Sequence, residues 1–104
     1  MIVVNVSYTV KPEFVQKNQE NIRSFMTDFK KMNKNDFRYQ VYLKEDGRTF
    51  VHFSHFKDEE IQKKILAVPS FKSFQQERDE SGLDSSHKLE VFKVVDTSAR
   101  ILEE

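Results

Sequence analysis

The apolar residues of this chain recur with a period of 2 in some segments and of 3.6 in others. These two periods separate strands from helices. Residues 2–10 alternate and predict a strand. One of its faces is fully apolar and consists of Ile2, Val4, Val6, Tyr8 and Val10. We expect that face to pack against helices, whereas the opposite face is mixed.

A long amphipathic helix is predicted next. It begins near Lys11-Pro12-Glu13, because proline suits the first helical turn and a carboxylate is favourable there. A polar run over residues 33–36 ends it. The stripe expected to face the core consists of Phe14, Asn18, Ile22, Phe25, Met26, Phe29 and Met32.

Two strands joined by a short turn follow this helix. Residues 37–44 and 49–56 both alternate, and Glu45-Asp46-Gly47-Arg48 separates them. An Asp-Gly pair tolerates the positive φ angles of a type I′ turn. The segment therefore predicts a β-hairpin.

A second helix is expected to begin at Asp58, a favourable N-cap. Pro69 interrupts it, and Phe71 and Phe74 then continue the apolar face three residues apart. The charged run Glu77-Arg78-Asp79-Glu80 is interpreted as a solvated helix face. After this helix, residues 89–95 predict the last strand.

The order of elements is thus β-α-β-β-α-β, in a single domain over residues 1–97 with a C-terminal tail over 98–104. This order predicts an α+β fold, a ferredoxin-like sandwich. It has a four-stranded antiparallel sheet with both helices on one face.

The second face of the sheet must meet either solvent or a partner. The residues predicted there are Asn5, Ser7, Tyr42, Phe50, His52, Ser54, Phe56 and Phe92. Such a face is too aromatic for solvent and too polar for a dry core. A homodimer formed by packing two sheets together would bury it and could enclose a pocket for a small hydrophobic or aromatic molecule.

Composition narrows the classes of function. Lys plus Arg and Asp plus Glu each number 17, so no basic excess favours nucleic acid. The absence of cysteine excludes disulfides and thiolate chemistry and fits a cytoplasmic protein. Two glycines are too few for a Rossmann fingerprint or a P-loop. No apolar run approaches the ~20 residues of a membrane span, and the N-terminus does not resemble a signal peptide.

His52 and Asn5 are the candidate catalytic residues. A histidine titrates near neutrality and could act as a general base toward a phenol or quinol. Asn is disfavoured in mid-strand, so Asn5 is interpreted as a hydrogen-bonding residue of a pocket. The alternative for both is an ordinary place on a solvated or interface surface. His52 and His55 point to opposite faces of one strand, so they cannot hold one metal ion together and no metal site is predicted.

Three stretches resemble the antibiotic-biosynthesis-monooxygenase-like (ABM) family of the dimeric α/β-barrel superfamily. The first is Met1-Ile2-Val3-Val4-Asn5-Val6 leading to Lys11-Pro12-Glu13. The second is His52-Phe53-Ser54-His55-Phe56 with Lys57-Asp58-Glu59-Glu60 behind it. The third is Leu66-Ala67-Val68-Pro69-Ser70-Phe71-Lys72-Ser73-Phe74, similar to a small-x-Pro-x-Phe-x-x-Phe run of the family.

The resemblance implies a ferredoxin-like protomer, a sheet-to-sheet dimer and, in known members, cofactor-independent oxygenation of quinols or polyphenols. Related proteins bind and degrade heme. Ile65 stands where quinol-oxidising members commonly carry histidine. In the heme-degrading relatives Asn5 has a counterpart, but Ile65 replaces a tryptophan and Gln75 replaces the axial histidine.

Three hypotheses follow. The first is a cofactor-independent monooxygenase that acts on a small aromatic or quinol-type substrate, with His52 as base and Asn5 holding the oxyanion. The second is a non-catalytic module for small-molecule binding or assembly. The third is a heme-binding relative, against which Ile65 and Gln75 count.

Overall fold

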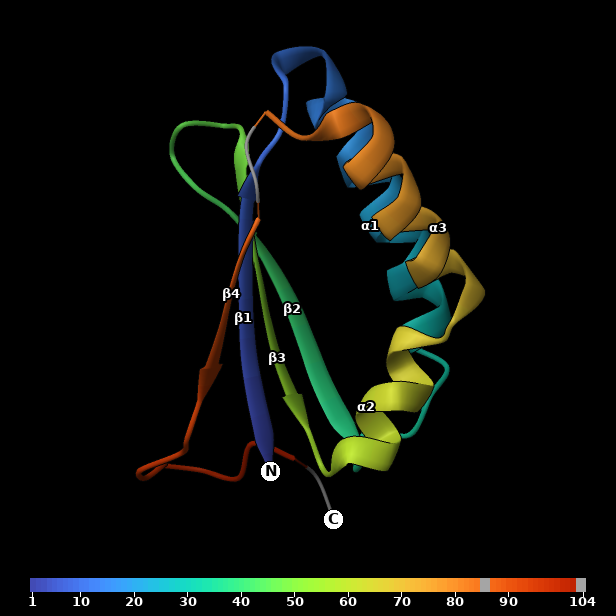
Figure 1. Ribbon diagram of the computed structural model, residues 1–104. Coiled ribbons are helices and arrows are strands. Elements are labelled where there is room, and N and C mark those ends of the chain that lie inside the picture. The colour runs from blue at the N-terminus through green and yellow to red at the C-terminus, as the bar shows by residue number, and fades with distance from the viewer. Residues whose placement is uncertain (85–86, 103–104) are drawn as a thin grey trace.

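The computed structural model describes residues 1–84 and 87–102. Its sheet has four antiparallel strands in the spatial order β2-β3-β1-β4 (Figure 1). The strands are β1 (Ile2–Thr9), β2 (Phe37–Leu43), β3 (Thr49–Phe56) and β4 (Lys88–Phe92). The expected last strand over 89–95 therefore begins one residue earlier and ends at Phe92.

All helical segments lie on one face of this sheet (Figure 1). They are η1 (Pro12–Phe14), α1 (Val15–Phe29), α2 (Glu59–Leu66), α3 (Pro69–Glu77) and the π-helical turn η2 (Arg78–Gly82). The Asp58 side chain caps α2 by accepting from the Ile61 backbone N–H at 2.9 Å. Pro69 occupies the first turn of α3, as its fixed φ and missing N–H favour. The predicted α+β, ferredoxin-like fold is confirmed.

The register between β1 and β3 decides which side chains face the helices. Val4 pairs with Ser54, Val6 with His52 and Tyr8 with Phe50, and directly paired residues share a face. The residues of β3 on the helix-covered face are Phe50, His52, Ser54 and Phe56, and all four are buried. The prediction that these four lie on the outer face is therefore wrong. It failed because both faces of β3 carry aromatic residues, so alternation alone does not select the buried one.

The core between sheet and helices is mainly aromatic. Phe25 is fully buried, and its ring centroid lies 5.0 Å from those of Phe29, Phe71 and Phe74. Tyr39 from β2 meets the Phe25 ring edge-on at 5.6 Å. Edge-to-face contacts of this kind stabilise a core beyond the area that they bury.

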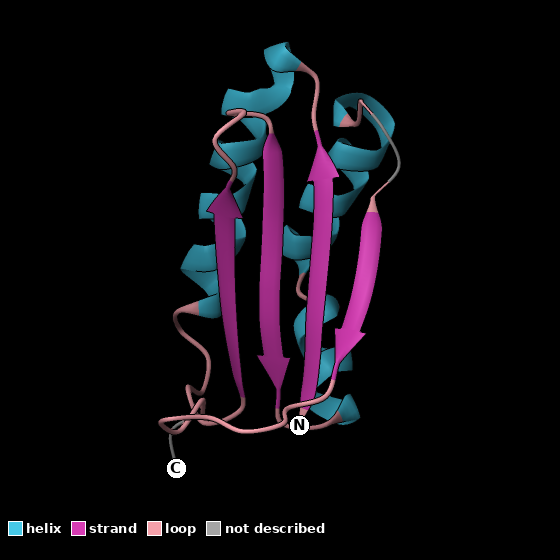
Figure 2. Cartoon of the chain, turned by 90° about the vertical axis from the view of Figure 1, so that its left-hand side faces the viewer, coloured by secondary structure: helices cyan, strands magenta, loops and turns pink. Residues whose placement is uncertain are grey.

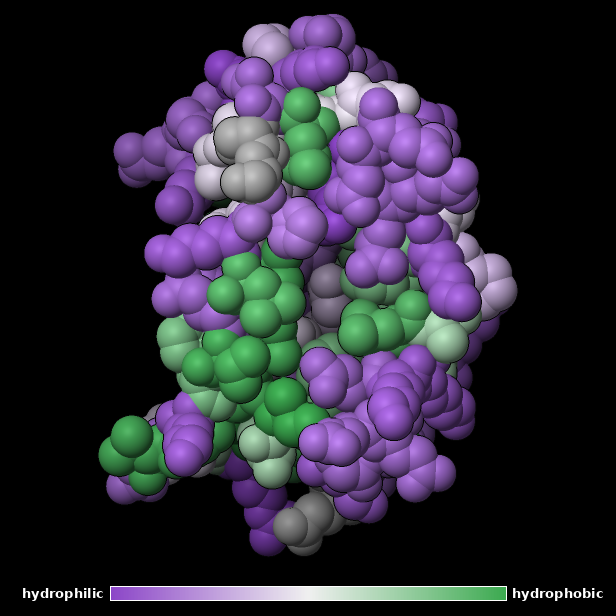
Figure 3. All heavy atoms as spheres, in the orientation of Figure 1, coloured by the Kyte–Doolittle hydropathy of each residue, from purple (hydrophilic) through white to green (hydrophobic). Residues whose placement is uncertain are grey.

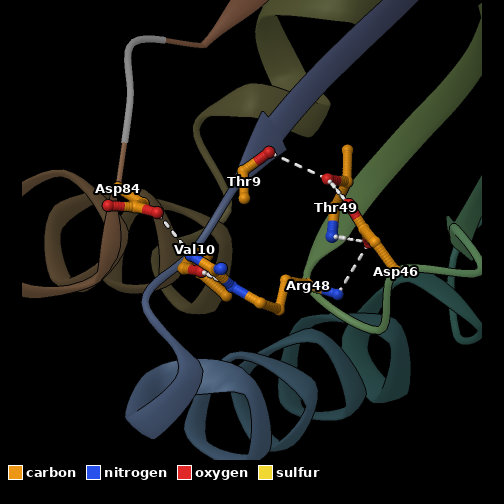
Figure 4. A network of polar contacts seen from close by, with 6 residues as sticks. All are labelled: Thr9, Val10, Asp46, Arg48, Thr49 and Asp84. Atoms are coloured by element: carbon orange, nitrogen blue, oxygen red, sulfur yellow. Dashed lines mark hydrogen bonds and ion pairs between the residues drawn. The ribbon is translucent and has the colours of Figure 1, made fainter.

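The hairpin between β2 and β3 differs from the prediction in its turn type. Gly47 has a φ of +72°, whereas no other described residue has a positive φ, so the turn is not type I′. The Asp46 carboxylate instead accepts from the backbone N–H groups of Arg48 and Thr49 (Figure 4). A hydrogen bond from the Thr49 hydroxyl to this carboxylate, together with these two, lowers the pKa of Asp46 to about 2.

Arg48 connects this hairpin to the segment that precedes β4. Its Nε donates to the Val10 carbonyl at 3.1 Å, and its guanidinium forms an ion pair with Asp84 (Figure 4). Thr9 and Thr49 join β1 to β3 through their hydroxyls at 2.8 Å. These polar contacts thus hold together the end of the sheet at which β1 ends and β3 begins.

No described element covers the outer face of the sheet, although the chain beyond β4 crosses one end of the strands (Figure 2). This crossing segment and its neighbours form a shallow groove lined by Met1, Asn35, Lys57, Val94, Thr97, Arg100, Ile101 and Leu102. Part of the expected tail over 98–104 therefore contacts the domain, and residues 103–104 lie outside the described part. No described helix is both long and apolar enough to cross a membrane.

The close approach of η2 to η1 yields a stability prediction. A β-carbon at Gly82 would overlap the ring of Phe14, which is buried and cannot move freely. We expect Gly82→Ala to lower the free energy of unfolding by about 1–3 kcal/mol, measured by urea denaturation. Gly47→Asn is the control, because nothing lies within 4 Å of its β-carbon and Asn tolerates a positive φ. Equal stabilities for the two variants would contradict the prediction.

Candidate functional site

A cavity of about 130 Å³ lies between the sheet and helices α2 and α3. It is lined by Val4, Val6, Tyr39, His52, Ser54, Phe56, Gln62, Leu66, Phe71, Gln75, Arg78, His87 and Leu89. Its open side is the hollow near the centre of Figure 3, next to an apolar patch. Leu89 and Val91 of β4 share the sheet face that the helices cover, yet they are 60% and 66% exposed. The helices therefore leave β4 uncovered, and this gap gives access to the cavity.

A chain of four polar side chains begins at the cavity wall and runs into the core. The Tyr39 hydroxyl lies 2.7 Å from Nδ1 of His52, and the Tyr8 hydroxyl lies 2.7 Å from Nε2 of the same ring. Asn18 Nδ2 donates to the Tyr8 hydroxyl at 2.9 Å. The chain thus joins β2, β3, β1 and helix α1.

The donors and acceptors as placed assign a direction to this chain of hydrogen bonds, from Asn18 toward Tyr39. Tyr8 accepts from Asn18, so its own proton is free to be donated to Nε2 of His52. A neutral imidazole then carries its proton on Nδ1 and donates it to the Tyr39 oxygen. The Tyr39 proton is left to point at an acceptor in the cavity. The alternative direction follows if the Asn18 amide is turned over, since the Asn18 carbonyl oxygen has no partner as placed.

Burial keeps this chain electrically neutral. It lowers the pKa of His52 to about 3, with a further contribution from the nearby positive charge of Arg78. Burial also raises the pKa values of the Tyr8 and Tyr39 hydroxyls well above their usual value near 10. None of the three side chains is charged near neutral pH, so the chain acts through hydrogen bonds.

Arg78 adds a positive charge to the cavity wall. It is the first residue of the π-helical turn η2, and its side chain is only 7% exposed. Its guanidinium carbon lies 5.1 Å from the centre of the Tyr8 ring and 5.3 Å from that of Phe74, as in cation–π contacts. The interpretation of the run 77–80 as a solvated face is therefore wrong for Arg78.

The structure divides the predicted site residues between the two sheet faces. His52, Ser54 and Phe56 line the cavity, and Phe50 lies on the same face, stacked with Tyr8 at 5.7 Å. The other four predicted residues, Asn5, Ser7, Tyr42 and Phe92, lie on the outer face. Their strand partners show this: Asn5 pairs with Phe53, Ser7 and Tyr42 each pair with Val51, and Phe92 pairs with Val3. The expectation that Asn5 and His52 share one pocket is wrong, because they lie on opposite sides of the sheet.

Sequence reasoning missed the partners of His52. Tyr8 belongs to the predicted apolar face of the first strand, and Asn18 belongs to the predicted core stripe of the long helix. Asn18 did carry a signal, because an amide in an otherwise apolar stripe needs a buried partner. Arg78 carried none, since a charged residue in a charged run is normally solvated. The described residues contain no cluster of three or more His, Asp or Glu suited to a metal ion.

Comparisons with known proteins identify relatives of this architecture. The family model for antibiotic biosynthesis monooxygenase (ABM) matches residues 1–77. An antibiotic biosynthesis monooxygenase of known structure superposes with a TM-score of 0.79 at 13% identity, covering 92% of this chain and 100% of that chain.

Two further solved structures share the fold. A conserved protein from Methanosarcina mazei Go1 has a TM-score of 0.75 at 22% identity, covering 88% of this chain and 90% of that chain. A Mycobacterium tuberculosis protein has a TM-score of 0.79 at 15% identity, covering 94% of this chain and 98% of that chain. A comparison with curated proteins gives no match.

The lowered pKa of His52 predicts how stability depends on pH. Between pH 6.5 and about 3 the unfolded chain binds a proton at this position and the folded chain does not. The free energy of unfolding therefore falls as the pH is lowered through this window, by up to about 1.4 kcal/mol per unit. Burial and the nearby charge of Arg38 also lower the pKa of His55. The contribution of His52 is therefore measured by comparing a variant of each histidine.

Urea denaturation between pH 7 and 4 measures this dependence. We expect His52→Gln to be less stable than the parent at pH 7 and to lose less stability on acidification. His55→Gln, which changes a histidine on the outer face, should keep most of the parent's dependence. A parent stability that stays constant across this range would contradict a neutral, buried His52.

Proposed function

Because this chain belongs to the antibiotic biosynthesis monooxygenase family, we propose that its cavity binds a small aromatic or quinol-type molecule and that the protein oxygenates it without a cofactor. The observation that supports this proposal most directly is that a partly apolar cavity lies next to a buried chain of hydrogen bonds. An apolar cavity of about 150 Å³ in another protein holds benzene, so about 130 Å³ suits a single ring. The open side next to β4 leaves room for substituents.

The reaction class requires only the substrate and dioxygen. A phenol with a hydrogen at its para carbon reacts with O₂ to give a quinone and water. One oxygen atom becomes the new carbonyl oxygen, and the other leaves as water with the hydroxyl proton and the ring hydrogen. The four electrons that the ring loses are the four that O₂ gains, so no external reductant is needed.

The part of the protein in this scheme is to hold the substrate oxygen where negative charge develops. Tyr39 can donate its hydroxyl proton to that oxygen in the direction of the chain in which Nδ1 of His52 donates to the Tyr39 oxygen. A donor fixed in advance, in a site that excludes most water, stabilises developing charge more than one that must reorient. Phe56 and Phe71 would pack against the ring.

His52 supports this scheme best as a positioning residue. Both of its ring nitrogens already have hydroxyl partners, and its pKa of about 3 makes it a weak base near neutral pH. The hypothesis that His52 removes a phenolic proton stays a prediction. Asn5 would not hold the oxyanion in this cavity, because it faces the other side of the sheet.

The alternative is a binding module without turnover. It is favoured by Ile65, which is buried in the core where quinol-oxidising relatives commonly carry histidine, and by the weak basicity of His52. Heme does not suit this cavity. Its volume is below the roughly 300–1,000 Å³ of pockets for larger ligands, and Gln75 stands where the axial histidine was expected.

Turnover and its dependence on Tyr39 test the enzymatic proposal. Purified protein is incubated with a panel of phenols and hydroquinones under isotopically labelled dioxygen, and quinones are analysed by mass spectrometry. We expect one labelled oxygen atom in the product and at least a tenfold lower kcat/KM for Tyr39→Phe, because that variant lacks the hydroxyl donor. Tyr42→Phe, on the outer face, should stay within twofold of the parent. Binding of the panel without turnover would favour the binding module.

We also propose that the outer sheet face joins two copies in a homodimer. That face carries stacked Phe53 and Phe92 rings, 6.2 Å apart, and no described element covers it (Figure 2). Its exposed apolar side chains include Phe92, which is 37% exposed. A second sheet could supply the apolar cover that this face lacks.

Light scattering after size exclusion tests this assembly. We expect twice the mass of the 12.4 kDa chain, and a shift toward the single-chain mass for Phe53→Lys, which places a charge on the proposed interface. Circular dichroism shows whether the variant stays folded. A single-chain mass for the parent at all concentrations would contradict the homodimer.

A further inference from the structure

The cavity contains a cation that the protein itself only partly neutralises. Arg78 donates from Nε to Asp79 at 2.9 Å, and that carboxylate is about half exposed. Its two terminal nitrogens have no hydrogen-bond partner among the described residues, although the side chain lines the cavity. No aspartate or glutamate is among the described residues that line this cavity.

The terminal donors of this largely buried guanidinium can be met in the cavity by water or by an anion, and hydrogen bonds to an anion are the stronger ones. The other polar groups around the cavity do not supply one. His52 and the two tyrosines of the hydrogen-bonded chain are neutral, and Gln62, Gln75 and Ser54 carry no charge. Within the described lining, the positive charge of Arg78 is therefore not matched by a negative charge, which favours an anion among the molecules that could enter.

From this geometry we propose that the cavity binds its aromatic ligand as an oxyanion, with the charged oxygen between the Arg78 guanidinium and the Tyr39 hydroxyl. This inference rests on the proposed binding of an aromatic molecule and adds its charge and orientation. Both groups lie on the wall of the same cavity, and the Tyr39 hydroxyl has a proton for a ligand when His52 donates to its oxygen. Arginine suits this role, because its planar fork matches the geometry of anionic oxygens.

The orientation of the ring follows from the rest of the wall. Arg78 is held over the faces of Tyr8 and Phe74, which fixes its plane and limits the entropy lost on binding. Phe56, Phe71 and Leu66 provide apolar surface for a ring attached to the oxyanion. The ring edge remote from the charge would then face Leu89 and the open side of the cavity.

A phenolate and a carboxylate share this oxyanion chemistry, so the test contains both. The probes are 4-nitrophenol, 4-nitrobenzoate and the neutral 4-nitroanisole, each with one ring of similar size. Their dissociation constants are measured by isothermal titration calorimetry with the full chain. We expect at least one anion to bind about tenfold or more tightly than 4-nitroanisole, because hydrogen bonds to charged groups are stronger than those to neutral groups.

The absorbance of 4-nitrophenol reports its ionisation directly, because the phenolate absorbs at longer wavelength than the phenol. At a pH below the pKa of the free phenol, bound probe should show the phenolate band. If 4-nitrophenol binds with this band and 4-nitrobenzoate binds weakly, the oxyanion is a phenolate. The reverse preference identifies a carboxylate.

Arg78→Gln removes the charge and keeps hydrogen-bonding capacity. We expect it to weaken binding of the preferred anion at least tenfold and to change binding of 4-nitroanisole less than threefold. Arg78→Lys should restore part of the anion affinity. Arg23→Gln is the matched control, because Arg23 is exposed on α1 and does not line the cavity. Circular dichroism melting confirms that each variant is folded.

The comparison of probes on the unmodified protein keeps the proposal falsifiable even if the Arg78 variants do not fold. Equal binding of the anions and 4-nitroanisole would overturn the oxyanion inference and leave the aromatic site standing. Tighter binding of 4-nitroanisole would do the same. Failure of all three probes to bind would overturn the inference and the proposed aromatic site together.

Discussion

The imidazole of His52 is buried between sheet and helices, and much of the site depends on how its two nitrogens are satisfied. A buried imidazole without partners would destabilise the fold, so each nitrogen requires its own hydrogen bond. Tyr8 and Tyr39 supply these bonds from the strands on either side, and Asn18 supports Tyr8 from helix α1. The same bonds that stabilise the core also hold Tyr39 at the wall of the cavity.

The cavity exists because the helical layer is narrower than the sheet. Pro69 separates α2 from α3, and neither helix extends over β4, so the inner face of that strand stays open (Figure 1). The aromatic core fills the space under α1 and α3 but does not extend to the inner face of β4. A cavity with one open side, lined by apolar side chains and a few polar groups, is typical of small-molecule binding sites.

Arg78 places a positive charge beside the neutral hydrogen-bonded chain. Arg78 is the first residue of a π-helical turn, a local geometry that often occurs at functional sites. Its stacking on Tyr8 and Phe74 places the guanidinium beside the hydrogen-bonded chain, and its positive charge favours the neutral form of His52. The positive charge and the neutral chain thus support the same conclusion, a cavity suited to an anionic oxygen on an aromatic ring.

The sequence by itself determined the order of elements, the fold class and the family resemblance. Hydrophobic period, the Asp58 cap, the Pro69 break and the glycine of the hairpin are local signals, and each acts within a few residues of itself. The buried face of β1 was also predictable, because its even positions are all apolar.

Only the tertiary structure decided which face of β3 is buried. Both faces of that strand carry aromatic residues, and the choice follows from pairing with β1 and β2 across the sheet. That choice moved His52 away from Asn5 and brought it to Tyr8, Tyr39 and Asn18. Arg78 entered the site for a similar reason, since its burial results from rings and strands distant in the sequence. Side-chain chemistry at this site is set by long-range register and packing, which no local pattern contains.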